Sequence, residues 1–218
     1  MAKLVMSEEE VMLADMARGF LDGAMPVSKL RAMRDAGETF DAATWEEMAD
    51  MGWAGVLVPE EAGGSDMGFA AANVIAHEMG KTLAVSPFIS SAVIAATALR
   101  QVSDARALGA LAKIASGELT YALAVDEGIK FDPDNAQMEA KADGNAFRLN
   151  GKKQFVVDGA NADRFLVLAR TSNGLTLFDI PLDRAGVNRE VSNMIDARDA
   201  ARITFEDVEA TGEDVLGA

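Results

Sequence analysis

Carboxylates are the chemically active side chains that this sequence offers in number, because it has 35 Asp and Glu residues against one histidine and no cysteine. His77 stands beside Glu78 in a helix-like pattern. No nucleophile lies near it in a triad-like order, so histidine-activated nucleophilic catalysis is not indicated. A lone helical histidine is expected at a packing or surface position. Because the chain has no cysteine thiolate, only carboxylates could coordinate a metal ion together with His77. We expect no metal site.

Two apolar runs that each end in an acid are the candidates for a binding strand. YALAV leads into Asp126 and Glu127, and Phe155-Val156-Val157 leads into Asp158. Strand alternation puts Phe155 and Val157 on one face and Val156 and Asp158 on the other. From the pattern alone two interpretations stay open. The strands end in solvent and Phe155 is a core aromatic, which the pattern favours, or one exposed face carries a flat ligand.

Other ligand and partner classes are limited by composition and motifs. There is no GxGxxG and no P-loop, so Rossmann and nucleotide-triphosphate sites are unsupported. The net charge of −15 disfavours binding to nucleic acid and to anionic membrane surfaces. The N-terminus does not resemble a secretory signal, and the longest apolar run, Phe88 to Leu99, is too short to span a bilayer. We expect a soluble, cytoplasmic protein without membrane insertion.

The elements that must position these residues change character near Gly117. Helical periodicity precedes it and strand periodicity follows it, which predicts an α+β multidomain fold. An all-α helical domain is expected over residues 1–116 and an antiparallel β-barrel or sandwich over residues 117–218. The predicted helices are Ser7 to about Leu21, Val27 to Ala36, one capped by Asp41, one from Met67 to Gly80, one from Pro87 to about Arg100, and one opened by Ser103-Asp104.

The predicted strands are short and are separated by turn residues. Asn150-Gly151 is interpreted as a hairpin turn between two of them. Gly63-Gly64, in an earlier loop, is interpreted as supplying positive φ angles. The expected strands are Thr120 to Val125, Gln137 to Ala142, Ala146 to Leu149, Lys153 to Val157, Arg164 to Ala169, Leu175 to Ile180, Gly186 to Val191 and Ala201 to Phe205.

Four segments, taken in order, resemble the acyl-CoA dehydrogenase family. The helical part carries WEEMADMGWAGVLVPEEAGGSDMGFAAANVIAHEMGK, similar to the family's N-terminal domain. The β part carries ALAVDEG, GNAFRLNGKKQFVVDGANADRFLVLAR and ARITFEDVEATGEDVLG, which resemble its middle domain. The resemblance covers essentially the whole chain. It implies FAD as cofactor, an acyl-CoA substrate, and a role in fatty-acid β-oxidation.

The resemblance also implies where the flavin lies. The cofactor-binding residues it indicates are Leu123, Val125, Asp126, Phe155, Val156 and Val157. Phe155 stands where many members have tryptophan and could cover the ring. Val157 stands where many have Thr or Ser, and only its backbone N–H could replace their hydroxyl. Asp126 replaces the threonine of the family's TEP segment. When ionised it cannot donate a hydrogen bond, and it would disfavour a negatively charged reduced flavin.

The implied reaction is α,β-dehydrogenation, in which a base removes the α-proton and the β-hydrogen leaves as hydride to the flavin. The family's base lies in a third, C-terminal domain that would begin where this sequence ends, at Ala218. No catalytic residue is therefore assigned here, and we expect the chain alone to be inactive. An electron-transfer acceptor protein and further copies in a homo-oligomer are the implied partners. Two alternatives stay open: a non-catalytic subunit that binds a partner or an acyl-CoA, and a relative with oxidase or monooxygenase chemistry.

Overall fold

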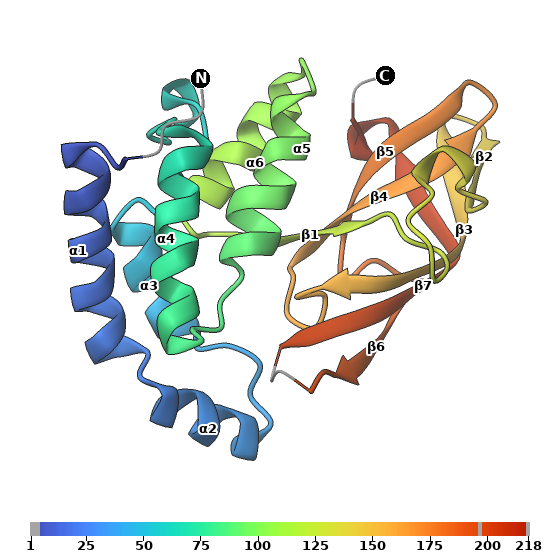
Figure 1. Ribbon diagram of the computed structural model, residues 1–218. Coiled ribbons are helices and arrows are strands. Elements are labelled where there is room, and N and C mark those ends of the chain that lie inside the picture. Colours follow the sequence, from blue (N-terminus) through green and yellow to red (C-terminus); the bar gives the residue numbers. More distant parts are fainter. Residues whose placement is uncertain (1–4, 196–197, 217–218) are drawn as a thin grey trace.

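The structure is a computed structural model that describes residues 5–195 and 198–216. Figure 1 shows the helices grouped on one side of the molecule and the sheet on the other, with strand β1 running between them. The helical half comes first in the chain and the β half second. The expected order of helical and β structure is therefore confirmed.

The helices begin and end at the residues that cap them. Ser7 forms a capping box with Glu10, and the side chains of Asp41 and Asp104 accept hydrogen bonds from backbone N–H groups of the first turns. Gly37 ends its helix in the left-handed conformation. The α-helices are α1 (Glu8–Ala24), α2 (Val27–Ala36), α3 (Ala42–Asp50), α4 (Gly68–Thr82), α5 (Ala96–Arg100) and α6 (Ala105–Ala115), with short 3₁₀ helices η1 (Glu60–Ala62), η3 (Pro133–Asn135) and η4 (Gly212–Asp214).

Two details of the helical half differ from the sequence interpretation. The helix expected from Pro87 to Arg100 is a π-helix, η2 (Phe88–Ala95), that continues into α5. Gly63 does have a positive φ of 79°, but Gly64 serves a different purpose. A Cβ on Gly64 would lie 2.0 Å from the carbonyl oxygen of Val58, so glycine is needed there for close backbone approach.

The β half is one mostly antiparallel sheet of eight strands within the described residues. Its order is β6-β7-β3-β2-β4-β5-β8, and β1 pairs with β4 in parallel. A single parallel bridge also joins β2 to β4. The strands are β1 (Tyr121–Ala124), β2 (Glu139–Asp143), β3 (Ala146–Val157), β4 (Arg164–Thr171), β5 (Gly174–Pro181), β6 (Val187–Asn193), β7 (Asp199–Thr211) and β8 (Val215–Leu216).

The hairpin expected at Asn150-Gly151 is wrong, because β3 runs through these residues as one strand of 12 residues. Its pairing with β7 is displaced at Gly151, where the register steps from Leu149 opposite Val208 to Gly151 opposite Phe205. A Cβ on Gly151 would lie 2.7 Å from the Met138 side chain. The glycine thus marks a β-bulge and a close contact rather than a reversal of the chain.

Hydrophobic residues form a core in each half and a third cluster between them. The third cluster joins Leu111 and Ile114 of α6 to Tyr121 of β1, Leu166 of β4 and Leu216 of β8. All five side chains are less than 5% exposed. The two halves therefore share a packed interface, and β1 lies within it.

Candidate functional site

A second bulge in β3 shapes the candidate site. Lys153 lies opposite Ile203 of β7, and the next paired residue, Val156, lies opposite Ala201. Three steps along β3 thus match two along β7, and the extra residue is accommodated by Phe155, whose φ is +52°. A positive φ is unfavourable for a side chain of this size. The bulge turns both Lys153 and Val156 inward, although they are three residues apart.

The bulge leaves an apolar surface exposed at the end of β3. Phe155 is 57% exposed and Val157 is 40% exposed, whereas Val156 and Asp158 are 1% and 7% exposed. The sharing of faces expected from alternation is confirmed. Phe155 is not a core aromatic, so the structure favours the interpretation in which this strand presents a flat apolar face to a ligand.

The segment that follows β1 lies against this end of β3. The backbone N–H of Gln154 donates to the carbonyl oxygen of Asp126 over 2.7 Å. The ammonium group of Lys153 donates to the carbonyl oxygen of Val125 over 3.1 Å. These bonds bring Val125 and Asp126, which are both half-buried, beside Lys153 and Gln154, the two residues that precede Phe155.

Two of the six candidate binding residues direct their side chains into the protein. Val156 belongs to the core of the β half, and Leu123 packs partly buried against the cluster between the two halves. The Val156 side chain is 1% exposed and leaves only backbone groups to face a ligand, whereas Leu123 is half-buried. The remaining four, Val125, Asp126, Phe155 and Val157, are half-buried or exposed at the site.

A cleft of about 540 Å³ opens at Val125 and Asp126, and no residue of β3 lines it. It is lined by the connection from β1 to β2, including Val125, Asp126, Ile129 and Gln137. Ile129 is 93% exposed. Most of its other lining residues are charged or carry amides, among them Glu127, Lys130 and Asp132, so the cleft offers polar groups beside a small apolar area.

One oxygen of Asp126 has an unusual environment. Its Oδ1 atom is buried and has no hydrogen-bond partner among the described residues. Buried carboxylate oxygens are ordinarily paired, and an unpaired one is unfavourable. Asp126 therefore carries an unsatisfied acceptor that is buried in the protein and not open to solvent.

Sequence reasoning missed the buried ion pair beneath the site. The Lys153 ammonium lies 2.7 Å from Glu127 Oε1, and the Lys153 side chain is 0% exposed. Burial lowers the pKa of Lys153, although Glu127 opposes this shift. The available signal was the run of Lys152-Lys153 at the start of an apolar strand, but the inward turn of the second lysine depends on a bulge that alternation cannot predict.

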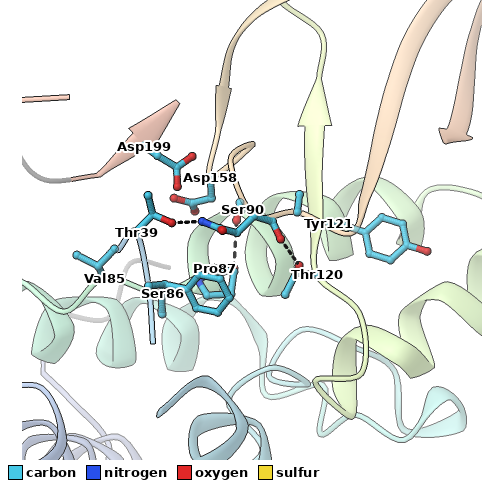
Figure 2. A pocket seen from close by; sticks show the side chains of 12 residues that line it. Thr39, Val85, Ser86, Pro87, Ser90, Thr120, Tyr121, Asp158 and Asp199 are labelled. Atoms are coloured by element: carbon cyan, nitrogen blue, oxygen red, sulfur yellow. Dashed lines mark hydrogen bonds between the residues drawn. The ribbon is translucent and has the colours of Figure 1, made fainter. Parts of the chain in front are cut away.

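A second polar cluster lies where the two halves meet, as Figure 2 shows. Asp158 and Asp199 are 7% and 6% exposed there. Burial raises the pKa of each carboxyl group, and in Asp158 this outweighs the nearby guanidinium of Arg198, 3.5 Å away. The cavity between them has a volume of only about 10 Å³, enough for about one water molecule. This cluster is therefore an interior polar contact and not a substrate site.

No group of three or more His, Asp or Glu residues that could hold a metal ion occurs within residues 5–195 and 198–216. His77 is exposed on α4. In the same described part of the chain, no helix is long and apolar enough to cross a membrane.

Two family models match consecutive parts of the chain. Residues 7–118 match the N-terminal domain of acyl-CoA dehydrogenase, and residues 122–208 match the middle domain of acyl-CoA dehydrogenase. Together the two matches cover both halves of the fold.

Similar proteins carry the same description. The acyl-CoA dehydrogenase FadE27 of Mycobacterium tuberculosis is 30% identical over 151 residues, which are 69% of this chain and 39% of that protein. A variant of the steroid ACAD Tcur3481-Tcur3483 has a similar structure, with a TM-score of 0.85 and 28% identity over 96% of this chain and 57% of that one. A glutaryl-CoA dehydrogenase from Mycobacterium smegmatis, solved in complex with FADH2, shares the fold with a TM-score of 0.83 and 17% identity over 96% of this chain and 55% of that one.

The chain is shorter than these relatives. Its matches cover between 26% and 48% of the length of eight curated relatives, so it spans less than half of each.

Proposed function

The chain belongs to the acyl-CoA dehydrogenase family, and from that premise we propose that it supplies the flavin-binding surface of an FAD-dependent acyl-CoA dehydrogenase. The reaction would be the α,β-dehydrogenation of an acyl-CoA thioester. The observation that carries the proposal is the exposed apolar face of Phe155 and Val157, on a strand that is hydrogen-bonded through Lys153 and Gln154 to Val125 and Asp126.

The exposed apolar side chains fit the face of an isoalloxazine ring, whereas Asp126 fits its polar edge only in part. A flat aromatic ring system can pack on an apolar strand face, and Phe155 can cover part of it. The oxidised ring carries one N–H group between two carbonyl oxygens. An ionised Asp126 can only accept hydrogen bonds, so it could accept from the N–H group through Oδ2 alone, because Oδ1 is buried, and it would repel the carbonyl oxygens. FAD, when bound, would supply the hydride acceptor of the reaction.

The chain's own residues would bind and orient the ring and keep water from one of its faces. Phe155 and Val157 would exclude water, since their side chains are apolar and lie on the same face of β3. The Val157 backbone N–H would take the place of the absent hydroxyl as hydrogen-bond donor. We assign no residue of this chain to removal of the substrate proton, so proton transfer would depend on a group outside the residues described here.

The proposed partners follow from the same premise. They are an acyl-CoA substrate, an electron-transfer acceptor protein, and further copies of the chain in a homo-oligomer within the cytoplasm. Exposed apolar side chains on the β half, including Ile129 at 93% and Phe131 at 77% exposure, support association with other surfaces. The division into domains at residues 116 and 117 is likewise proposed.

The test is an FAD titration followed by quenching of flavin fluorescence. Val157→Glu places a charge on the apolar face, and we expect it to weaken FAD binding by about ten-fold or more because the glutamate would be desolvated under the ring. Leu175→Glu is the matched control, since Leu175 is 38% exposed on β5 and Val157 is 40% exposed. Equal affinity of V157E and L175E would refute the assignment of this face.

A second function has specific support from two substitutions. Val157 lacks the hydroxyl that many family members have at this position, and Asp126 introduces a carboxylate at the flavin edge. Both changes are compatible with a non-catalytic subunit that binds an acyl-CoA or a partner without oxidising substrate. Calorimetric titration separates the two functions: binding of octanoyl-CoA with no binding of FAD would favour the non-catalytic subunit.

A further inference from the structure

Lys153 is a lysine in a place where lysine is rare. Its side chain is fully buried at 0% exposure, and lysine is seldom fully buried unless it is paired. The preceding residue, Lys152, is exposed. The inward position of Lys153 follows from the bulge at Phe155, so the same distortion that exposes the apolar face also buries this charge.

The partner of Lys153 is a carboxylate with three hydrogen bonds. Glu127 Oε1 accepts from the Lys153 ammonium at 2.7 Å and from the backbone N–H of Met138 at 3.0 Å. Glu127 Oε2 accepts from the backbone N–H of Gln137 at 2.7 Å. Glu127 therefore joins β3 to both ends of the loop between residues 127 and 138.

Other contacts also attach this loop to the protein, since Met138 is buried in the core of the β half and its carbonyl oxygen accepts from the backbone N–H of Arg170 over 2.8 Å. Its regular structure is the short helix η3 (Pro133–Asn135). The Arg170 side chain donates to the carbonyl oxygens of Ala136 and Asp134 over 3.1 and 2.9 Å. The Gln154 side chain donates to the Glu127 carbonyl oxygen over 2.8 Å. The ion pair is the buried and charged part of this set.

We propose that the Lys153–Glu127 pair is a positioning device, which holds the 125–138 segment as one wall of the candidate flavin cleft and thereby sets ligand affinity. Lys153 also donates to the Val125 carbonyl oxygen, so the pair fixes the residue next to Asp126. The inference rests on the proposed function for the identity of the ligand, but not for the role of the pair in holding the loop.

The electrostatics explain why the pair acts as a unit. Burial lowers the pKa of Lys153. Burial alone would raise the pKa of Glu127, but the hydrogen bonds from Lys153, Gln137 and Met138 outweigh it and lower this pKa. Removing Glu127 leaves Lys153 as an unpaired buried charge, and removing Lys153 leaves Glu127, which is 22% exposed, with two backbone hydrogen bonds but no cation. Removing both leaves neutral groups of similar size.

The experiment combines FAD titration with hydrogen exchange of the loop amides. Lys153→Met and Glu127→Gln, singly and together, are compared with Lys141→Met and Glu139→Gln. The control pair lies on β2, and its side chains are 73% and 59% exposed at a separation of 2.9 Å. We expect each single change at the buried pair to speed exchange of residues 128–138 and to weaken FAD binding by about ten-fold, because an unpaired buried charge distorts its surroundings.

The double variant and the spectrum of the bound flavin distinguish positioning from general stability. We expect K153M/E127Q to bind FAD more tightly than either single variant, and each single variant to alter the visible absorption spectrum of bound flavin. Controls should stay within about two-fold of the unmodified chain, as expected for exposed pairs. Unchanged loop exchange, or additive effects in the double variant, would overturn the proposal. If the unmodified chain binds no FAD, the proposed function fails, while the exchange measurement still decides the role of the pair.

Discussion

At the scale of single residues, Asp126 departs most from what a flavin edge requires. Its backbone carbonyl oxygen is satisfied, because it accepts a hydrogen bond from the N–H of Gln154. Its Oδ1 atom, in contrast, is buried without a partner among the described residues. The residue is therefore held in place by its backbone while its side chain is unfavourable for stability.

Replacing Asp126 by threonine should raise both stability and flavin potential. Removing the unpaired oxygen should increase the free energy of unfolding by about 1 kcal/mol. Removing a negative charge from the flavin edge should make reduction easier, since the reduced ring can carry a negative charge. Urea denaturation and a potentiometric titration of bound flavin measure the two effects. Asp134→Thr, an exposed position in the same loop, should change neither. A loss of stability in D126T would contradict this account.

Asp158 should make stability depend on pH in a defined direction. Burial raises the folded-state pKa of Asp158 above the ordinary value of 3.8. The folded protein thus takes up a proton at a higher pH than the unfolded chain, and folding is favoured as pH falls through this window. Asp199 and the Ser90 side chain face the same carboxyl group, as does Arg198. The stability of the unmodified chain relative to Asp158→Asn should therefore rise as the pH is lowered from 7 toward 4.

Urea unfolding at a series of pH values measures this difference. Asp22→Asn, an exposed change on α1, is the control and should show no such trend. If the stability of the unmodified chain relative to D158N stays constant or falls on acidification, Asp158 is not held as the buried, less acidic group described above.

At the scale of elements, the helices could be predicted well because capping residues next to them in the sequence determine where they begin and end. Ser7, Asp41 and Asp104 stand at helix starts and do cap them, and Gly37 does end α2. β3 could not be predicted correctly. Asn150-Gly151 is a strong hairpin signal, but pairing with β7 along both parts of β3 overrides it.

The bulge at Phe155 gives an element-scale prediction about glycine. Phe155→Gly and Phe155→Ala remove the same ring, but alanine keeps a Cβ at a φ of +52°. Phe155→Gly should therefore be more stable than Phe155→Ala by about 1 kcal/mol. At Val157, where no positive φ occurs, the order should be reversed. Guanidinium unfolding of the glycine and alanine variants at positions 155 and 157 measures both differences. If the alanine variant is the more stable one at both positions, the bulge is not strained.

At the scale of the whole molecule, the division into a helical and a β half follows from the change in periodicity near Gly117. The packing between the two halves could not be predicted from this change in periodicity. Leu166 on β4 is fully buried, but nothing in its strand pattern indicates that it faces α6 rather than other strands. Likewise, the position of Phe155 beside Asp126 depends on a bulge and on long-range hydrogen bonds, which single-sequence patterns do not encode.

The shared cluster predicts that the two halves unfold together. Leu166→Ala should lower the free energy of unfolding by about 2–5 kcal/mol, because Leu166 is buried against α6. The helical half should lose as much stability as the β half, although the substitution lies on a strand of the β half. Both tryptophans, Trp45 and Trp53, lie in the helical half, so their fluorescence reports on it while circular dichroism reports on the whole chain. Leu175→Ala is the exposed control, and tryptophan fluorescence that keeps its original midpoint in L166A would contradict a shared core.

The central claim is that the end of β3 and the segment after β1 form a flavin-binding surface. Hydrogen exchange of the chain with and without excess FAD, followed by mass spectrometry, tests it most directly. We expect FAD to slow exchange in residues 125–128 and 154–158, while α1 and α2 exchange as before. Protection confined to the helical half, or no protection at any FAD concentration, would contradict the account.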